Sequence, residues 1–267
     1  MVTGFLLLLA AGAAAGYLGG LLGIGGGLLV VAALSLVLPT LGFPHSVVMH
    51  VAIATSLTSI VFTFASSSLA HLRRGSIVWS SWMRLAPGMV LGAILGARLA
   101  NDLPESALRW IVALFCGFMA WRMAFGKSRV TEGEDHVPRS PWLLLAGGGI
   151  GAFSAVLGIG GGSLTVPLLS SLGVRPVKAV GTSALCGLAL TLAGTASYLL
   201  TTHATPVPLP EGTVGDVYLP AALITAAAAA AAAPWGVRTA HAISGTAIKR
   251  VFAGFLVVVG ALMVSGG

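Results

Sequence analysis

The chain has 267 residues, of which 57% are hydrophobic and only 8% are charged. Soluble globular proteins carry about 25% charged residues, so the composition excludes an ordinary soluble domain and predicts that lipid surrounds most of the chain. The formal net charge is +7, but Lys and Arg flank apolar runs instead of forming one patch. This spacing argues against a nucleic-acid surface and fits the orientation rule for membrane proteins.

The first half is expected to hold one broken apolar segment and three spans. As one helix, residues 5–38 would be about 50 Å long, too long for a bilayer core of about 30 Å, and a glycine cluster at 23–27 interrupts them. Spans are expected over 47–69, 79–98 and 108–125. The second of these spans contains Gly88, Gly92 and Gly96 at four-residue spacing, which predicts a face for close helix approach. The first basic residue is Arg73, so the first run lacks the positive start of a cleavable signal peptide and is expected to stay in the mature fold.

The second half repeats this order after a polar linker at 126–141. An apolar run over 142–172 is broken at 158–162, and spans are expected over 177–200, 217–237 and 248–264. The loop over 201–216 contains no Lys or Arg, and the alanine run 226–233 is expected to form a packing surface. Matching features recur at similar offsets, because Gly23 precedes Gly158 by 135 residues (158 − 23) and Arg98 precedes Arg238 by 140 (238 − 98).

Basic residues predict how the halves are oriented. Loops rich in Lys and Arg face the cytoplasm, which places the loop with Arg73 and Arg74, the linker 126–141 and the basic residues of 238–250 inside. Arg109, near the predicted outer face, is the exception. Each half then crosses the membrane an odd number of times, and both termini lie on the outer, periplasmic side.

The resulting fold class is an all-α polytopic membrane protein built from two inverted repeats, at 1–125 and 142–267. Each repeat has a Gly-broken re-entrant or discontinuous helix pair followed by three spanning helices. Inverted repeats with broken helices in corresponding positions are typical of alternating-access carriers, and the breaks mark the substrate site.

The glycine breaks predict an anion site. Each glycine weakens a helix interior by roughly 0.8–1 kcal/mol relative to alanine, and a helix that restarts after a break presents free N–H groups and a positive dipole end. The acidic residues lie in expected loops or span ends, so no carboxylate marks a cation site, although main-chain carbonyls alone can hold Na⁺. The candidate substrate residues are Gly25, Gly26, Gly27, Gly160, Gly161, Gly162, Ser163, Thr55, Ser56, Thr182, Ser183, Arg98 and Arg238.

Each of these features also has a structural interpretation. Glycines in membrane helices commonly serve close packing, and Thr or Ser in a span commonly bonds the preceding turn of its own helix. Arg98 and Arg238 end their spans, where arginine side chains snorkel to the interface; as substrate contacts they would capture the anion at the cytoplasmic mouth. His50 and His241 are expected to be structural.

The sequence contains no pattern typical of an enzyme or a metal site. Cys116 and Cys186 lie in apolar runs without a CxxC or Cys/His pattern and are expected to be small buried hydrophobes. Neither glycine cluster completes a nucleotide-binding loop, and no HExxH or hydrolase triad lies at membrane depth. We therefore expect no catalytic activity, no cofactor and no bound metal.

The motif Gly-Ile-Gly-Gly-Gly-x-x-x-x-Pro occurs at 158–167 and is partly repeated at 23–27, and the chain also contains the Thr-Ser pairs and a polar loop at the centre of the sequence. In these features the chain resembles the TauE/SafE sulfite-exporter family over essentially its whole length. The first copy has Ala32-Ala33 where the second has Pro167, which predicts unequal contributions of the halves. The resemblance implies a permease that moves sulfite, a sulfonate such as sulfoacetate, or a related sulfur anion, usually outward across the bacterial inner membrane.

The predicted function is therefore export of a small sulfur-containing anion, with the lipid bilayer and that anion as partners and a homodimer left open. An anion channel and a non-transporting membrane scaffold are the alternatives. An anion leaving a negative-inside cell gains about 2.3 kcal/mol per charge per 100 mV. Efflux is thus expected to follow the membrane potential and to survive mutation of every acidic residue.

Overall fold

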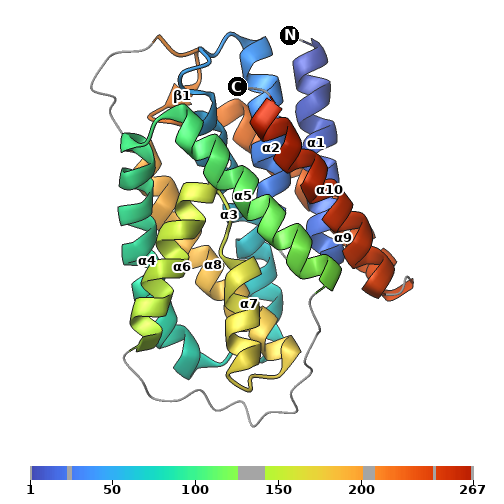
Figure 1. Cartoon of the computed structure of the whole chain (residues 1–267). Coiled ribbons are helices and arrows are strands. Elements are labelled where there is room, and N and C mark those ends of the chain that lie inside the picture. The colour runs from blue at the N-terminus through green and yellow to red at the C-terminus, as the bar shows by residue number, and fades with distance from the viewer. Residues whose placement is uncertain (1, 23–25, 126–141, 201–207, 243–244, 266–267) are drawn as a thin grey trace.

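The computed structural model describes residues 2–22, 26–125, 142–200, 208–242 and 245–265, and helices make up nearly all of them (Figure 1). The helices are α1 (Val2–Leu22), α2 (Gly27–Val37), the 3₁₀ turn η1 (Leu38–Leu41), α3 (Val48–Arg73), α4 (Trp79–Asp102), α5 (Glu105–Phe125), α6 (Trp142–Leu157), α7 (Gly162–Ser171), α8 (Pro176–Leu199), α9 (Leu219–Ala242) and α10 (Gly245–Ser265). Two short strands, β1 (Thr213–Val214) and β2 (Val217–Tyr218), pair antiparallel.

The predicted segments agree with these helices, and the all-α class is confirmed. The expected breaks fall between α1 and α2 and between α6 and α7. At one boundary the type of secondary structure differs from the prediction: residues 217–218, predicted to begin a span, form β2 because they pair with β1, and the helix starts at Leu219. Helices α9 and α10 also extend into the predicted connection 238–247, because α9 ends at Ala242 and α10 begins at Gly245. The predicted linker 126–141 and residues 201–207 of the predicted loop lie outside the described residues.

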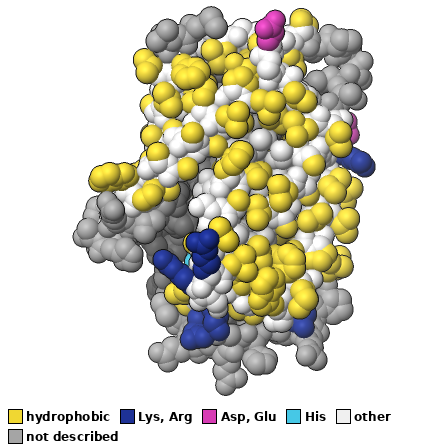
Figure 2. Space-filling model, turned by 180° about the vertical axis from the view of Figure 1, so that it is seen from behind, with side chains coloured by type: hydrophobic (Ala, Val, Ile, Leu, Met, Phe, Trp, Pro, Cys, Tyr) yellow, Lys and Arg dark blue, Asp and Glu magenta, His cyan; other side chains and the backbone are white. Residues whose placement is uncertain are grey.

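The outer surface is typical of a protein surrounded by lipid. Within the described ranges, α3, α4 and α8 are long and apolar enough to span a membrane, and α1, α2, α6 and α9 contain shorter apolar stretches. Large apolar side chains such as Leu114, Trp121 and Leu145 are more than 60% exposed. Figure 2 shows apolar side chains over most of one face, with most Lys and Arg side chains toward its lower end.

Glycines let α4 and α6 approach until their backbones touch. The predicted glycine face at Gly88, Gly92 and Gly96 is confirmed, because a Cβ atom on any of the three would overlap a main-chain carbonyl of α6. Small residues allow such close helix pairs within a bilayer. The same reasoning applies to α1 and α9, where Gly16 lies against the carbonyl of Ala229 in the alanine run, as the packing-surface prediction requires.

Helix α3 forms the centre of the molecule. Every residue from Val48 to Ile60 is buried, because α3 packs against α2, α8, α9 and β2. Its N-terminal end is held by α5, where both Glu105 carboxylate oxygens accept the Met49 N–H at 2.9 Å. A helix fixed in this way can position both breaks.

Candidate functional site

Both broken helices restart at a glycine in the left-handed region. Gly26 precedes α2 with φ 67°, and Gly161 precedes α7 with φ 72°. Glycine adopts this conformation without the steric penalty that a Cβ atom imposes. The first turn of the following helix has N–H groups without partners inside the helix, at the positive end of its dipole. Gly25, another predicted contact, lies outside the described residues.

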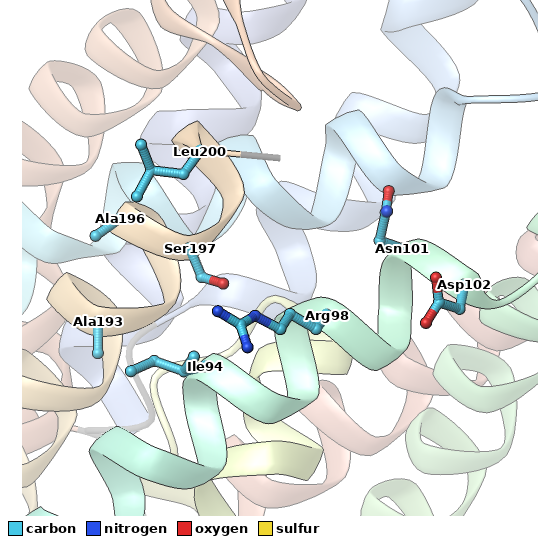
Figure 3. A pocket seen from close by; sticks show the side chains of 8 residues that line it. All are labelled: Ile94, Arg98, Asn101, Asp102, Ala193, Ala196, Ser197 and Leu200. Atoms are coloured by element: carbon cyan, nitrogen blue, oxygen red, sulfur yellow. The ribbon is translucent and has the colours of Figure 1, made fainter. Parts of the chain in front are cut away.

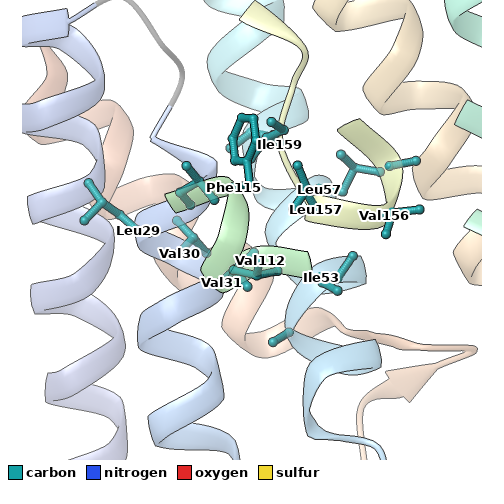
Figure 4. Packing of buried hydrophobic residues seen from close by; sticks show 14 of the residues in the cluster. Leu29, Val30, Val31, Ile53, Leu57, Val112, Phe115, Val156, Leu157 and Ile159 are labelled. Atoms are coloured by element: carbon teal, nitrogen blue, oxygen red, sulfur yellow. The ribbon is translucent and has the colours of Figure 1, made fainter. Parts of the chain in front are cut away.

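The two breaks lie against each other, and Ser56 of α3 joins them. A Cβ atom on Gly27 would be 2.7 Å from the Gly158 carbonyl oxygen. The Ser56 hydroxyl lies 3.0 Å from the Gly27 carbonyl oxygen and 3.0 Å from that of Gly158, so it can donate to either. Apolar side chains of both breaks, including Val31 and Ile159, surround this junction (Figure 4).

Thr55 and Thr182 make equivalent contacts in the two halves. The Thr55 hydroxyl oxygen accepts the Tyr218 N–H at 3.0 Å, and that of Thr182 accepts the Val78 N–H at 2.9 Å. Both acceptors bind main chain just before the start of a long helix, α9 and α4 respectively. Neither threonine bonds its own preceding turn through these contacts. Both hold another segment in place. This role differs from the two predicted ones, contact with the substrate and bonding to the preceding turn of the same helix.

Buried hydroxyl groups without partners gather at the second break. Within the described part of the chain, the hydroxyls of Ser154 on α6, Thr165 on α7 and Ser183 on α8 have no hydrogen-bond partner, and these residues are at most 2% exposed. The Ser154 oxygen is 3.4 Å from the place a Cβ atom would occupy on Gly161. Ser163, in the first turn of α7, is also buried.

Helices α7 and α8 bring Thr165 and Ser183 within one turn of the break. Thr165 follows Gly161 by four residues, and its N–H is bonded to the Gly161 carbonyl at 2.9 Å. Ser183 lies one turn before Gly187, where a Cβ atom would be 2.7 Å from the Gly160 carbonyl oxygen. A buried hydroxyl without a partner costs about 1–3 kcal/mol. The three hydroxyls lie on the helices that meet at this break, α6, α7 and α8, and each is a donor that a ligand can satisfy.

The aromatic ring of Phe64 closes this site. One edge of the ring lies where a Cβ atom of Gly160 would be, and the other lies 2.5 Å from the Cβ position of Gly187. Phe64 is only 6% exposed. Both glycines are therefore needed to accommodate the ring, and the second break is closed to solvent in this conformation.

The described residues around the first break contain no comparable hydroxyl cluster. The positions that correspond to Ser163 and Thr165 are Leu28 and Val30, each 135 residues earlier (163 − 28 and 165 − 30). The hydroxyls of α3 near α2 have partners, since Ser59 lies 2.7 Å from the Thr225 hydroxyl and donates to the Thr55 carbonyl. The two breaks thus share a backbone shape and differ in chemistry.

Arg98 lines a cavity at the end of α4, distant from the second break. The helix starts five residues after Arg74 and ends at Asp102, so Arg98 and the Arg73-Arg74 pair lie at opposite ends of α4. The prediction that Arg98 captures the anion at the cytoplasmic mouth is therefore incompatible with a cytoplasmic Arg73-Arg74 loop. The other predicted arginine, Arg238, is in α9, but its side chain is outside the described residues.

Charged side chains gather at one end of α3, away from the breaks. His50 Nδ1 lies 3.5 Å and Arg109 Nε 3.3 Å from the Glu105 carboxylate. Asp216, in the turn between β1 and β2, is fully buried although its position was expected to be a loop. In the described part of the chain, no cluster of three or more His, Cys, Asp or Glu side chains could hold a metal ion.

A family model described as "Sulfite exporter TauE/SafE" matches residues 8–263. The chain belongs to this family. TauE/SafE membership and the apolar helices make it a multi-pass membrane transporter, a permease rather than an enzyme. No solved structure matches the chain.

Relatives of this TauE/SafE protein carry the same general description. A "Probable membrane transporter protein" of Haemophilus influenzae is 35% identical over 97% of this chain and 97% of its own length. The "Probable membrane transporter protein MJ0441" of Methanocaldococcus jannaschii is 28% identical over 96% and 94%. The Bacillus subtilis "Probable membrane transporter protein YunE" is 27% identical over 74% and 80%.

Proposed function

We propose that this TauE/SafE protein exports a small sulfur-containing anion, sulfite or a C2 sulfonate, and holds it at the N-terminus of α7. The observation that carries the proposal is the set of buried hydroxyls without partners around Gly161. A sulfur oxyanion has several acceptor oxygens and no hydrogen-bond donor when fully ionised. Hydroxyls and main-chain N–H groups at a positive helix end are the donors that such a group requires.

The site we propose contains fewer residues than the set of substrate contacts predicted from the sequence. Ser154, Thr165 and Ser183 supply hydroxyl donors, and Gly161, Gly162 and Ser163 supply the helix end. Ser56, Thr55 and Thr182 act as positioning residues, because their hydroxyls bind main chain. The first break serves as the support against which the second is packed, since its corresponding positions are apolar.

We further propose that the halves, 1–125 and 142–267, are inverted repeats that alternate between two access states. The contacts in support of this arrangement cross between halves: α1 of the first packs on α9 of the second, and α6 of the second packs on α4 of the first. Thr55 likewise pairs with Tyr218, and Thr182 with Val78. Reciprocal contacts of this kind are expected when two copies related by a pseudo-twofold axis interlock.

Export in this scheme requires no coupling ion. A monovalent anion that leaves a cell at −100 mV gains about 2.3 kcal/mol. The described carboxylates lie at helix ends or around the β hairpin, so none contributes a negative charge to the α7 site. The membrane potential alone then drives net efflux.

Radiolabelled sulfite in proteoliposomes tests the proposal. Efflux should accelerate as the interior becomes more negative. Unlabelled sulfite outside should also stimulate it, because a carrier that binds sulfite outside returns to its inward-facing state faster than an empty one. Ser183→Ala and Ser154→Ala should each raise KM about tenfold or more, since a hydrogen bond to a charged group is worth about 1.5–3 kcal/mol. Ser171→Ala removes a hydroxyl from the far end of α7, where it bonds Leu168, and should leave KM unchanged.

Two results would contradict the proposal. Flux without trans-stimulation would indicate a channel. An unchanged KM in both Ser183→Ala and Ser154→Ala, with normal amounts of folded protein, would remove the site from the α7 N-terminus.

A further inference from the structure

A cavity of about 530 Å³ separates the last turns of α4 and α8. Its wall combines polar and apolar side chains, which are Ile94, Arg98, Asn101, Asp102, Ala193, Ala196, Ser197 and Leu200 (Figure 3). The Arg98 guanidinium extends from α4 toward Ser197 on α8. The cavity is far larger than one sulfite ion needs, so it can take a hydrated ion or an organic anion.

The charged groups of this cavity have no partner among the residues that the structure describes. Neither the Arg98 guanidinium nor the Asp102 carboxylate bonds to any other residue that the structure describes, although they are four residues apart on one helix. The Asn101 side-chain oxygen is buried and also lacks a partner in that part of the chain. Groups left uncommitted in a cavity are available to a ligand.

The cavity lies on the same two helices that contact the second break. Met89 of α4 and Leu190 of α8 approach the Cβ position of Gly161 at 3.0 and 3.3 Å. Arg98 is nine residues beyond Met89 and Ser197 is seven beyond Leu190, which correspond to about 14 Å and 10 Å along a helix. Leu57 and Ala93, both fully buried, lie in between.

We propose that this cavity is a second, peripheral binding site, in which Arg98 binds the acid group of a small organosulfonate. The inference rests on the proposed function, and it places the cavity on the opposite side of Met89 and Leu190 from the α7 site. The apolar wall of Ala193, Ala196 and Leu200 accommodates the short carbon chain of the sulfonate. Asp102 lowers the local positive potential, so binding is weak and reversible, as a transit site requires.

A cysteine at Ser197 tests the site without relying on transport. Both native cysteines are fully buried, so Ser197→Cys supplies the reactive thiol in the otherwise unchanged chain. Two methanethiosulfonate reagents of similar size, one with an ethylsulfonate and one with an ethyltrimethylammonium group, form a mixed disulfide with the thiolate and release methanesulfinate. The sulfonate reagent should react faster, and sulfoacetate should protect the thiol against both reagents.

Charge variants in the Ser197→Cys background assign the effect to Arg98. Arg98→Gln should lower the ratio of the sulfonate rate to the ammonium rate about fivefold, as expected for a partly exposed charge, and Arg98→Lys should retain most of it. Asp102→Asn should raise the ratio. Arg73→Gln removes the same charge at the opposite end of the molecule and should leave the ratio unchanged.

Three outcomes would overturn the inference: a ratio near one in the wild-type background, an equal loss in Arg73→Gln, or protection by anionic lipid headgroups in place of sulfoacetate. Each is distinguishable from failure of the proposed function. Sulfite flux with an unaltered reagent ratio in Arg98→Gln would overturn this inference alone. Protection by sulfoacetate in a protein that moves no sulfur anion would overturn the proposed function alone.

Discussion

The second break has its tightest side-chain packing where the Phe64 ring meets Gly160. Gly160→Ala adds a methyl group at a position that the Phe64 ring already occupies, and Gly187 confines the opposite edge of that ring. The ring cannot shift away from one glycine without meeting the other. Overpacking of this kind costs about 1–3 kcal/mol, and full expulsion of the ring would forfeit roughly 1.5–3 kcal/mol of buried phenylalanine. We expect Gly160→Ala to lower the free energy of unfolding by about 2–3 kcal/mol.

A double-mutant cycle measures the contact directly. Phe64→Leu alone leaves unfilled space, whereas in the double variant the new methyl group occupies part of that space. We therefore expect the two substitutions to be less costly together than their sum, with a coupling of about 1–3 kcal/mol. Unfolding by SDS in mixed micelles provides the free energies.

A Gly-to-Ala control at a position with free space is available on α6. Gly149→Ala meets no atom within 4 Å and should stabilise the helix by up to about 1 kcal/mol, because alanine is the better helix former. Equal effects of Gly160→Ala and Gly149→Ala, or strict additivity in the cycle, would refute the packing described for Phe64.

Three further predictions follow from hydrogen bonds and burial near α3. Ser56→Ala should lower the free energy of unfolding by about 1–3 kcal/mol because it removes the donor shared by the two breaks. Thr58→Ala should lower it less, because the Thr58 hydroxyl bonds within its own helix. Unfolding in mixed micelles compares the two variants. Glu105→Gln should keep potential-driven efflux yet lower thermal stability, since an amide has one acceptor oxygen in place of the two that accept at the start of α3; abolished flux in well-folded protein would contradict this. Phe64→Ala should speed sulfite leak from proteoliposomes because it opens the α7 site, whereas Phe62→Ala, at a side chain 51% exposed, should not.

Much of the fold could be predicted because glycine and apolar periodicity act locally. The glycines at 23–27 and 158–162 indicated both breaks, and the spacing of Gly88, Gly92 and Gly96 indicated a close helix contact, which is found with α6. The identity of the partner helix could not be predicted, because any small-residue face suits such a contact. The β hairpin was missed because two residues per strand are too few to give a pattern.

The site was harder to predict because hydroxyl groups have many uses. Thr55, Ser56, Thr182 and Ser183 were equivalent in the sequence, yet only the Ser183 hydroxyl is without a partner in the described chain. Whether a hydroxyl has a hydrogen-bond partner within the protein depends on segments far away in sequence, as when Thr55 accepts the Tyr218 N–H. Thr165 was missed although it follows Gly161 by one helical turn, a spacing that could have identified it.

Ser154 was missed for a different reason. It lies on α6 ahead of the glycine cluster, and only the fold of the break brings its oxygen to Gly161. Asp216 presents the same difficulty, because a loop position in sequence proved to be fully buried in the turn of the hairpin. Burial of a turn depends on the packing of other helices, which local sequence does not encode.

Equilibrium binding of sulfite to the purified protein tests the central claim most directly. Isothermal titration under anaerobic conditions should give one saturable site in the wild type and in Ser171→Ala, and at least tenfold weaker binding when Ser154, Thr165 and Ser183 are replaced together by Ala, Val and Ala. Equal affinity in the triple variant and the wild type would contradict an anion held at the N-terminus of α7.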